Sequence, residues 1–368
     1  MKKNKINNRD YGLDMMRILM TLFVIAIHIL NKGGAYSACY ADENIFKSGL
    51  ALELEFAVSC AVNGFALISG YVGCRSKFKI SRILWLYFTV SFYNAVIPLV
   101  FHFLRGYTID KVVILRAILP FAYDANWYFT AYLGMFFLIP FMNLGIKYLD
   151  KKQCITAIAA IMILFSVIPT LLYMFVTESY DYNIFKISAG YSPLWLAILY
   201  IVGAAIREHD LFRKVPRIMG LIVYLLSTII GASIASLGTI CPEEALDTYY
   251  SPLIIAQAIG LLLFFRELKM PGFVCKIVDF LAPHSFNIYI IHTQDAVWIM
   301  WLAGRYSSRA SECSPLLFPI MFVFYTVSIY GLCLIVDMPL YYSIKFFNRI
   351  FRKSGSSAAQ TQKEKINV

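Results

Sequence analysis

The sequence predicts an all-α integral membrane protein, a polytopic bundle of about ten transmembrane helices with its amino and carboxyl termini in the cytoplasm. Hydrophobic residues make up 60% of the 368 residues and charged residues only 15%, whereas globular proteins average about 45 to 50% apolar and about 25% charged residues. Apolar runs recur along the whole chain, and a helix of about 20 residues crosses a hydrocarbon layer of ~30 Å. Each run must be helical, because a lipid-exposed segment has to satisfy its own backbone hydrogen bonds.

The apolar runs define one membrane domain, residues 1–353, and a short polar tail. The segments expected to span the membrane are residues 13–30, 50–74, 83–104, 127–146, 154–176, 191–206, 217–238, 252–266, 285–302 and 316–340. Residues 354–368 read SGSSAAQTQKEKINV. Because this stretch has too little apolar surface to fold, we predict that it is a disordered cytoplasmic tail.

The distribution of lysine and arginine sets the orientation. Of the 33 Lys and Arg residues, 24 fall on the side of the amino terminus and 8 on the opposite side, with Arg17 inside the first helix. Positively charged loops stay in the cytoplasm, so the amino terminus is expected there, in a multi-pass protein of the cell membrane. The net charge of +11 is explained by this bias and by contact with membrane lipids, and a nucleic-acid partner is not expected.

The first helix carries three ionisable side chains, which are costly inside a membrane and therefore point to function. Arg17 and His28 are eleven positions apart, and eleven steps of roughly 100° return to within about 20° of the starting direction, so both lie on one face. Asp14 is one turn before Arg17 and can pair with it. Arg17 could also be a snorkelling anchor and His28 a helix-packing residue, but their alignment favours a polar cavity lined by both.

The second span ends in a basic loop. Ser69 belongs to the run NGFALISGYV, and Arg75, Lys77, Lys79 and Arg82 follow within eight positions. Such a cluster suits phosphate groups, although taken by itself it is better explained as a positive loop retained in the cytoplasm beside anionic lipid. Trp127 and Tyr128, at the outer end of the fourth span, are interpreted as aromatic-belt residues.

The ninth span places three polar residues on one stripe. Ser285, Tyr289 and His292 follow one another at intervals of four and three positions, which is helical spacing. Two deep histidines out of only five indicate one shared aqueous site. No P-loop, GxSxG elbow, dinucleotide fingerprint or zinc-ligand spacing is present in the sequence, so no metal is expected.

These stretches resemble the membrane-bound acyltransferase-3 superfamily, whose members O-acylate sugars of bacterial surface polysaccharides and exopolysaccharides. The resemblance rests on Arg17 with His28, on NGFALISGYV and its basic loop, on NWYFTAYLGMFFLIPFMN in the fourth span and on SFNIYIIH in the ninth. It covers the chain up to the tail. One departure is that lysines alternate with Arg75 and Arg82, whereas the family often has a denser arginine group after ISGY.

The resemblance implies an O-acyltransferase of the bacterial cytoplasmic membrane, with acetyl-CoA or another acyl-CoA as donor. The acceptor would be a hydroxyl of a cell-surface glycan, an exopolysaccharide or a lipid-linked precursor. His28 would be the catalytic group, with Arg17 orienting it or stabilising the thioester oxygen, and Arg75 and Arg82 would hold CoA phosphates. Asp14, Ser69, Ser285, Tyr289 and His292 would line the cavity. Direct attack with His28 as base and transient acylation of His28 both remain open, as does a transporter or flippase without covalent chemistry.

Overall fold

The computed structural model describes residues 9–42, 44–122, 126–175, 187–237 and 243–366, with the backbone alone described at residues 243–244 and 347–366. Within this part of the chain every regular element is a helix, and nine helical segments are long and apolar enough to cross a membrane. The chain is therefore a polytopic helical membrane protein, as predicted. The nine segments are Tyr11–Leu30, Ile45–Gly73, Ile80–Arg105, Trp127–Tyr148, Lys151–Phe175, Arg217–Ser236, Ala245–Phe265, Gly272–His292 and Phe318–Phe346.

Several of these spans are built from more than one helix. The single-helix spans are α1 (Tyr11–Leu30), α5 (Ile80–Arg105), α7 (Trp127–Tyr148), α11 (Arg217–Ser236) and α18 (Phe318–Ile366). The composite spans are α3 (Ile45–Val58) with α4 (Ala61–Gly73), α8 (Lys151–Met162) with the π-turn Ile163–Val167 and α9 (Ile168–Phe175), α12 (Glu243–Asp247) with α13 (Pro252–Phe265), and α14 (Gly272–Leu281) with the 3₁₀ turn Ala282–His284 and α15 (Ser285–His292). Short helices connect the spans: α2 (Ala35–Ala41), α6 (Lys111–Ile118), the 3₁₀ turn Ser188–Gly190, α16 (Asp295–Val297), the π-turn Trp298–Leu302 and α17 (Ser307–Glu312).

The sixth predicted span, residues 191–206, is not among these nine segments and corresponds to α10 (Pro193–Glu208). With 16 residues it is shorter than the other spans. A length of ~24 Å suffices here because α10 lies inside the bundle, where Trp195, Leu196, Leu199 and Tyr200 are fully buried.

The ninth predicted span, residues 285–302, is placed wrongly. The apolar segment in the structure is Gly272–His292, and it ends where Gln294 and Asp295 follow. Pro283 lies in the first turn of the short 3₁₀ segment, where its missing N–H costs no helical hydrogen bond. The chain therefore continues through this proline from α14 into α15.

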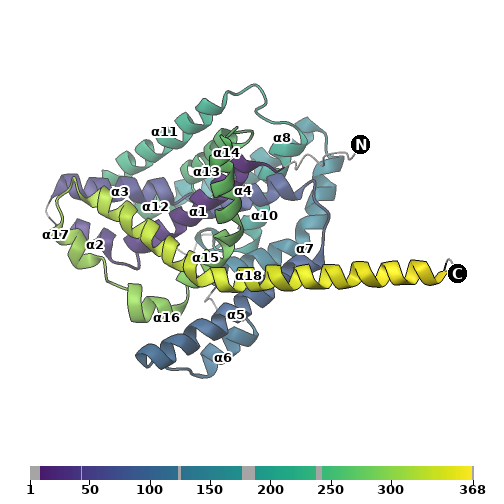
Figure 1. Ribbon diagram of the computed structural model, residues 1–368. Helices are drawn as coiled ribbons and strands as arrows, with labels where there is room; N and C mark the ends of the chain where they lie inside the picture. The colour runs from purple at the N-terminus through teal and green to yellow at the C-terminus, as the bar shows by residue number, and fades with distance from the viewer. Residues whose placement is uncertain (1–8, 43, 123–125, 176–186, 238–242, 367–368) are drawn as a thin grey trace.

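Figure 1 shows α1 in the middle of the bundle, with α11 along one edge and α5 with α6 at the opposite edge. α1 contacts α4, α13, α15 and α18. α10 packs along α4 at very close range, because a Cβ on Gly70 would lie 2.0 Å from the carbonyl oxygen of Tyr200 and one on Gly203 would lie 2.1 Å from that of Leu67. Only glycine allows two helices to approach this closely.

The helix α18 extends beyond the bundle, as its yellow C-terminal half shows in Figure 1. Its backbone is helical as far as Ile366, so it includes most of the tail that we predict to be disordered. An unpacked polar helix is only marginally stable in water, and the disordered tail stays a prediction. α1 begins and α18 ends on the same side of the bundle.

Candidate active site

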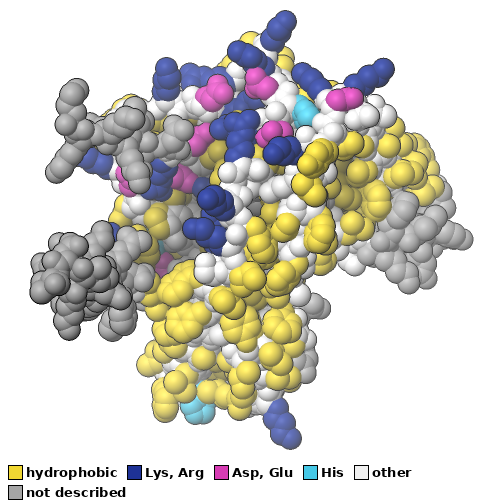
Figure 2. All heavy atoms as spheres, turned by 90° about the vertical axis from the view of Figure 1, so that its right-hand side faces the viewer, with side chains coloured by type: hydrophobic (Ala, Val, Ile, Leu, Met, Phe, Trp, Pro, Cys, Tyr) yellow, Lys and Arg dark blue, Asp and Glu magenta, His cyan; other side chains and the backbone are white. Residues whose placement is uncertain are grey.

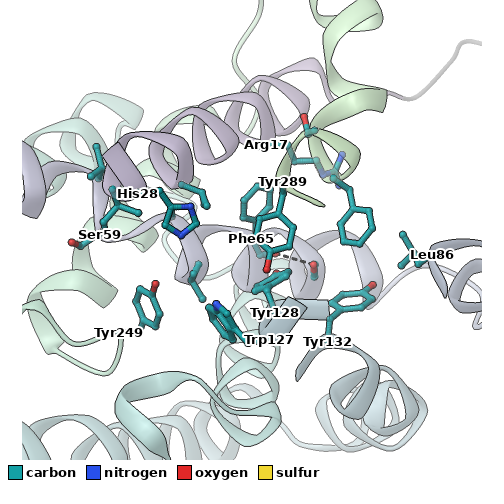
Figure 3. A pocket seen from close by; sticks show the side chains of 18 of the residues that line it. Arg17, His28, Ser59, Phe65, Leu86, Trp127, Tyr128, Tyr132, Tyr249 and Tyr289 are labelled. Carbon is teal, nitrogen blue, oxygen red and sulfur yellow. Dashed lines mark hydrogen bonds between the residues drawn. The ribbon is translucent and has the colours of Figure 1, made fainter. Parts of the chain in front are cut away.

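A cavity of about 250 Å³ runs through the centre of the bundle. Figure 3 shows Arg17 and His28 at its two ends, with Phe65, Tyr128 and Tyr289 between them. The cavity is thus long, mostly aromatic and polar at both ends. The residues that line it are Arg17, Val24, Ile27, His28, Val58, Ser59, Ala61, Val62, Phe65, Ser69, Leu86, Trp127, Tyr128, Tyr132, Tyr249, Ala282, Pro283, Ser285, Phe286 and Tyr289.

The deep end of the cavity holds a pair of histidines. His28 Nδ1 lies 3.0 Å from His292 Nε2, and His292 Nδ1 lies 2.8 Å from the carbonyl oxygen of Ile288. The indole of Trp298 meets the His28 ring edge to face, with centroids 5.6 Å apart. His28 is half-buried and lines the cavity, whereas His292 is only 1% exposed and is not among the lining residues. The two histidines share one site, as predicted, but His292 lies behind His28.

The other end of the cavity is marked by Arg17, ~16 Å from His28 along the axis of α1. Its guanidinium donates to the carboxylate of Asp14, which also pairs with Arg9. Arg9 reaches Asp279 of α14 with its other arm. One buried carboxylate therefore holds two arginines at the cavity end. The resemblance implied that Arg17 could orient the His28 ring. At this distance Arg17 cannot contact that ring, so it does not orient it.

Arg17 also lines a second, adjoining cavity of about 450 Å³. Figure 2 faces the side on which α18 ends and shows that Lys and Arg side chains gather over much of that face. This second cavity, the arginine pocket, has a cluster of positive charge beside the ring of Tyr71, an arrangement that suits phosphate groups. The residues that line the arginine pocket are Arg9, Asp10, Leu13, Asp14, Arg17, Tyr71, Val72, Arg75 and Arg207.

The two arginines predicted from the basic loop have different places. Arg75 lines the arginine pocket, with its Nη2 3.4 Å from the carbonyl oxygen of Arg207 and its Nε 3.5 Å from Glu208. Arg82 is exposed and lines neither cavity. It lies one turn before Leu86, a lining residue of the central cavity, so its side chain is on the same face of α5.

Sequence reasoning missed Arg207 as a member of this pocket. Its guanidinium donates to the hydroxyl of Tyr71 at 2.8 Å and stacks over that ring at 4.8 Å. The signal was present, because Arg207 ends a predicted span on the cytoplasmic side. In the sequence, however, it is only one more positive charge of an inner loop, since nothing in the sequence places α10 beside α4.

The wall near His28 is formed where one span is interrupted. α3 ends at Val58 and α4 begins at Ala61, and Ser59 at the break lines the cavity. Its hydroxyl donates to the carbonyl oxygen of Glu55 at 2.8 Å. Non-helical backbone at membrane depth is tolerated where it is buried in protein or borders a cavity, and the break lies at such a place.

Aromatic rings surround the same end of the cavity. Trp127 stacks on Tyr249 with centroids 6.0 Å apart and contacts Tyr191 at 4.4 Å. Trp127 and Tyr128 are both half-buried in the cavity wall. The interpretation of these two residues as a lipid-facing aromatic belt is therefore wrong. An aromatic residue at a helix end can lie at the membrane interface or line a cavity. The sequence alone does not distinguish these two roles.

Behind the cavity lies a fully buried ionisable pair. His284 Nδ1 bonds to the carboxylate of Asp337 on α18, which also accepts from Tyr93 and, at 2.8 Å, from Asn287. His284 and Asp337 are both 0% exposed. The residues just before and after His284, Pro283 and Ser285, line the cavity, so this pair fixes one wall of it.

The remaining predicted lining residues are placed as follows. Ser69, Ser285 and Tyr289 line the central cavity, and Asp14 lines the arginine pocket. Across the part of the chain that the structure describes, no three His, Cys, Asp or Glu side chains come together as a metal site.

A family model described as an acyltransferase domain matches residues 10–338 of the chain. The match includes every lining residue of both cavities except Arg9. The chain belongs to the acyltransferase-3 family. It is therefore a membrane acyltransferase, and membership favours acyl transfer over the alternative of transport without covalent chemistry. Comparison with curated proteins and with solved structures gave no match.

Proposed function

We propose that this acyltransferase is an O-acyltransferase of the bacterial cytoplasmic membrane, which moves an acetyl group from acetyl-CoA to a hydroxyl of a cell-envelope glycan or exopolysaccharide, or of its lipid-linked precursor. The observation that supports the proposal is that Arg17 lines both cavities. The arginine pocket, at the face expected to be cytoplasmic, therefore adjoins a mostly aromatic cavity that has His28 at its other end. The order of arginines, aromatic rings and histidine along the two cavities fits a ligand that has charged phosphates at one end, a slender arm and a reactive group at the other end.

The dimensions suit the proposed donor. The phosphates of acyl-CoA would lie among Arg17, Arg75 and Arg207, where charge-assisted bonds form. The ~16 Å from Arg17 to His28 is comparable to the length of an extended pantetheine arm, so the thioester of such a donor would lie beside His28. Arg17 is then a residue that binds the donor, and Arg82 is left to attract it from the surface.

The chemistry at His28 is a single transfer. The imidazole takes the proton of the acceptor hydroxyl while the oxygen attacks the thioester carbonyl carbon, and the new C–O bond forms. The C–S bond then breaks, and the departing thiolate takes the proton back from the imidazolium. No oxidant or metal is needed. Attack by His28 itself, through an acyl-imidazole, would use the same donor position.

The acceptor would approach from the end of the cavity opposite to the arginines. Trp127, Tyr249 and Ser59 line that end beside His28, and Tyr191 packs on the first two. Flat aromatic faces with nearby hydroxyl groups suit a sugar ring, which has apolar C–H faces and polar edges. Donor and acceptor would then meet at His28 from opposite sides.

The test measures transfer of radiolabelled acetyl from acetyl-CoA to polymer in membranes that carry the wild type, His28→Ala or His102→Ala at matched expression. His102 is an exposed histidine at the end of α5 and serves as the control. We expect labelled polymer with the wild type and the control only. Equal labelling by all three would remove His28 from the reaction, and absence of labelling in all three would remove acetyl-CoA as the donor.

A further inference from the structure

The hydrogen bonds behind His28 form a short chain that ends on the backbone. His28 bonds to His292, and His292 bonds to the carbonyl oxygen of Ile288 four residues earlier on the same helix. We infer that His292 is a positioning residue: it fixes which nitrogen of His28 carries the proton and so presents the other nitrogen to the cavity as a base. This inference rests on the proposed role of His28 in acyl transfer.

The direction of each bond follows from what each atom can do. A carbonyl oxygen only accepts, so the proton between His292 and Ile288 belongs to His292 Nδ1. A neutral imidazole has one N–H and one lone pair, and His292 Nε2 is therefore an acceptor. The proton in the 3.0 Å bond between the rings must then come from His28 Nδ1. The remaining nitrogen of His28, Nε2, is left with its lone pair.

The surroundings give that lone pair access to the substrate. His28 lines the cavity and turns Nδ1 towards His292, so Nε2 lies on the side of the ring away from the partner. Trp298 packs against the His28 ring at an interplanar angle of 86° and restricts its rotation. An imidazole without a fixed partner populates both tautomers, and only one of them has a base at Nε2.

A histidine partner also suits this depth in the membrane. A carboxylate could fix the same tautomer, but an additional buried anion would be costly there. When His28 Nε2 takes the hydroxyl proton, the ring becomes positive and its bond to the neutral His292 becomes charge-assisted, and such bonds are stronger than neutral ones. The partner therefore stabilises the transient imidazolium without placing a permanent charge beside the cavity.

Two substitutions separate this role from a packing role. His292→Gln keeps a side-chain oxygen that can accept from His28 Nδ1, and His292→Phe keeps the size of the ring but has no acceptor. We expect acyl transfer to fall about 10- to 100-fold in His292→Phe, less than the ~10⁴-fold that loss of a charged partner costs a catalytic histidine. His292→Gln should recover most of the rate.

The protonation pattern itself is read by ¹⁵N NMR of histidine-labelled protein in lipid, with His28→Ala used to assign the His28 signals. We expect a protonated Nδ1 and a bare Nε2 at His28 in the wild type and in His292→Gln, and mixed tautomers in His292→Phe. A wild-type His28 protonated at Nε2 would overturn the inference, as would equal activity of the two variants. The NMR result holds whether or not acetyl is transferred, so failure of the proposed function is distinguished from failure of this inference.

Discussion

The two ends of the central cavity differ in the charge and the burial of their polar residues. At the Arg17 end, guanidinium groups are partly exposed and held by carboxylates. At the His28 end, a half-buried imidazole bonds to the buried imidazole of His292, which in turn bonds to a backbone carbonyl. Under the proposed function, the charged donor would bind at the more exposed end, and proton transfer would take place at the more buried end, where electrostatic interactions are less screened.

The largest effect that tests this comparison is expected from His28. His28→Asn removes the base but leaves the arginine pocket intact, so kcat for acyl transfer should fall about 10²- to 10⁴-fold while KM for acyl-CoA changes little. Steady-state kinetics on protein in lipid nanodiscs measures both constants. A large rise of KM with kcat preserved would mean that the His28 end binds the donor and that the division between the two ends is wrong.

Arg17 should show the opposite pattern. In Arg17→Gln, Asp14 keeps its pair with Arg9, so the fold is retained while one phosphate contact is lost. We expect KM for acyl-CoA to rise about 10- to 100-fold, the value of a charged hydrogen bond, with kcat within about twofold. Arg105 is exposed at the C-terminal end of α5 and lines neither cavity. Arg105→Gln is therefore the matched control and should leave both constants unchanged.

The close contact of α4 and α10 should contribute to the stability of the bundle that surrounds the two ends. In Gly203→Ala the new Cβ would lie 2.1 Å from the carbonyl oxygen of Leu67, so the helices must separate, at a cost of about 1 to 3 kcal/mol. The midpoint of thermal unfolding in detergent should fall. Gly145→Ala on α7, whose Cβ meets nothing within 4 Å, is the control, and an equal fall in both would show that the contact is unimportant.

The smallest effect expected is that of ionic strength. Raising salt from about 0.05 to 0.3 M shortens the Debye length, and KM for acyl-CoA should rise several-fold because the arginine pocket is near water. The value of kcat should stay constant, because screening is weak around buried groups. If kcat depended on ionic strength, a charge exposed to solvent would have to act at the His28 end, which would contradict the comparison.

The helical class, most of the spans and the Arg17 and His28 pair could be predicted from sequence because each depends on local spacing. The alternation of apolar runs is set by membrane thickness, and the common face of Arg17 and His28 follows from helical periodicity. Both features are contained within one segment of chain. The span at residues 285–302 is placed wrongly because the apolar residues continue on both sides of His292, and apolar content alone does not show which stretch forms the long helical segment.

Contacts between distant segments could not be predicted in the same way. The meeting of Arg207 with Tyr71 depends on how closely α10 packs against α4, and His292 lies behind His28 because of the crossing of α1 and α15. Such geometry is set by side-chain packing between helices. The sequence therefore indicated a shared polar site but not the order in which its residues face the cavity.

The buried pair of His284 and Asp337 has a consequence for biosynthesis. The helix that supplies Asp337 lies downstream of the segment with His284, so during translation the histidine reaches the membrane before its partner exists. An unpaired polar group in that position is costly. The turn from Ala282 to Ser285 should therefore adopt its final conformation only after α18 has inserted, and the nascent protein would acquire a competent substrate channel as one of its last steps of assembly.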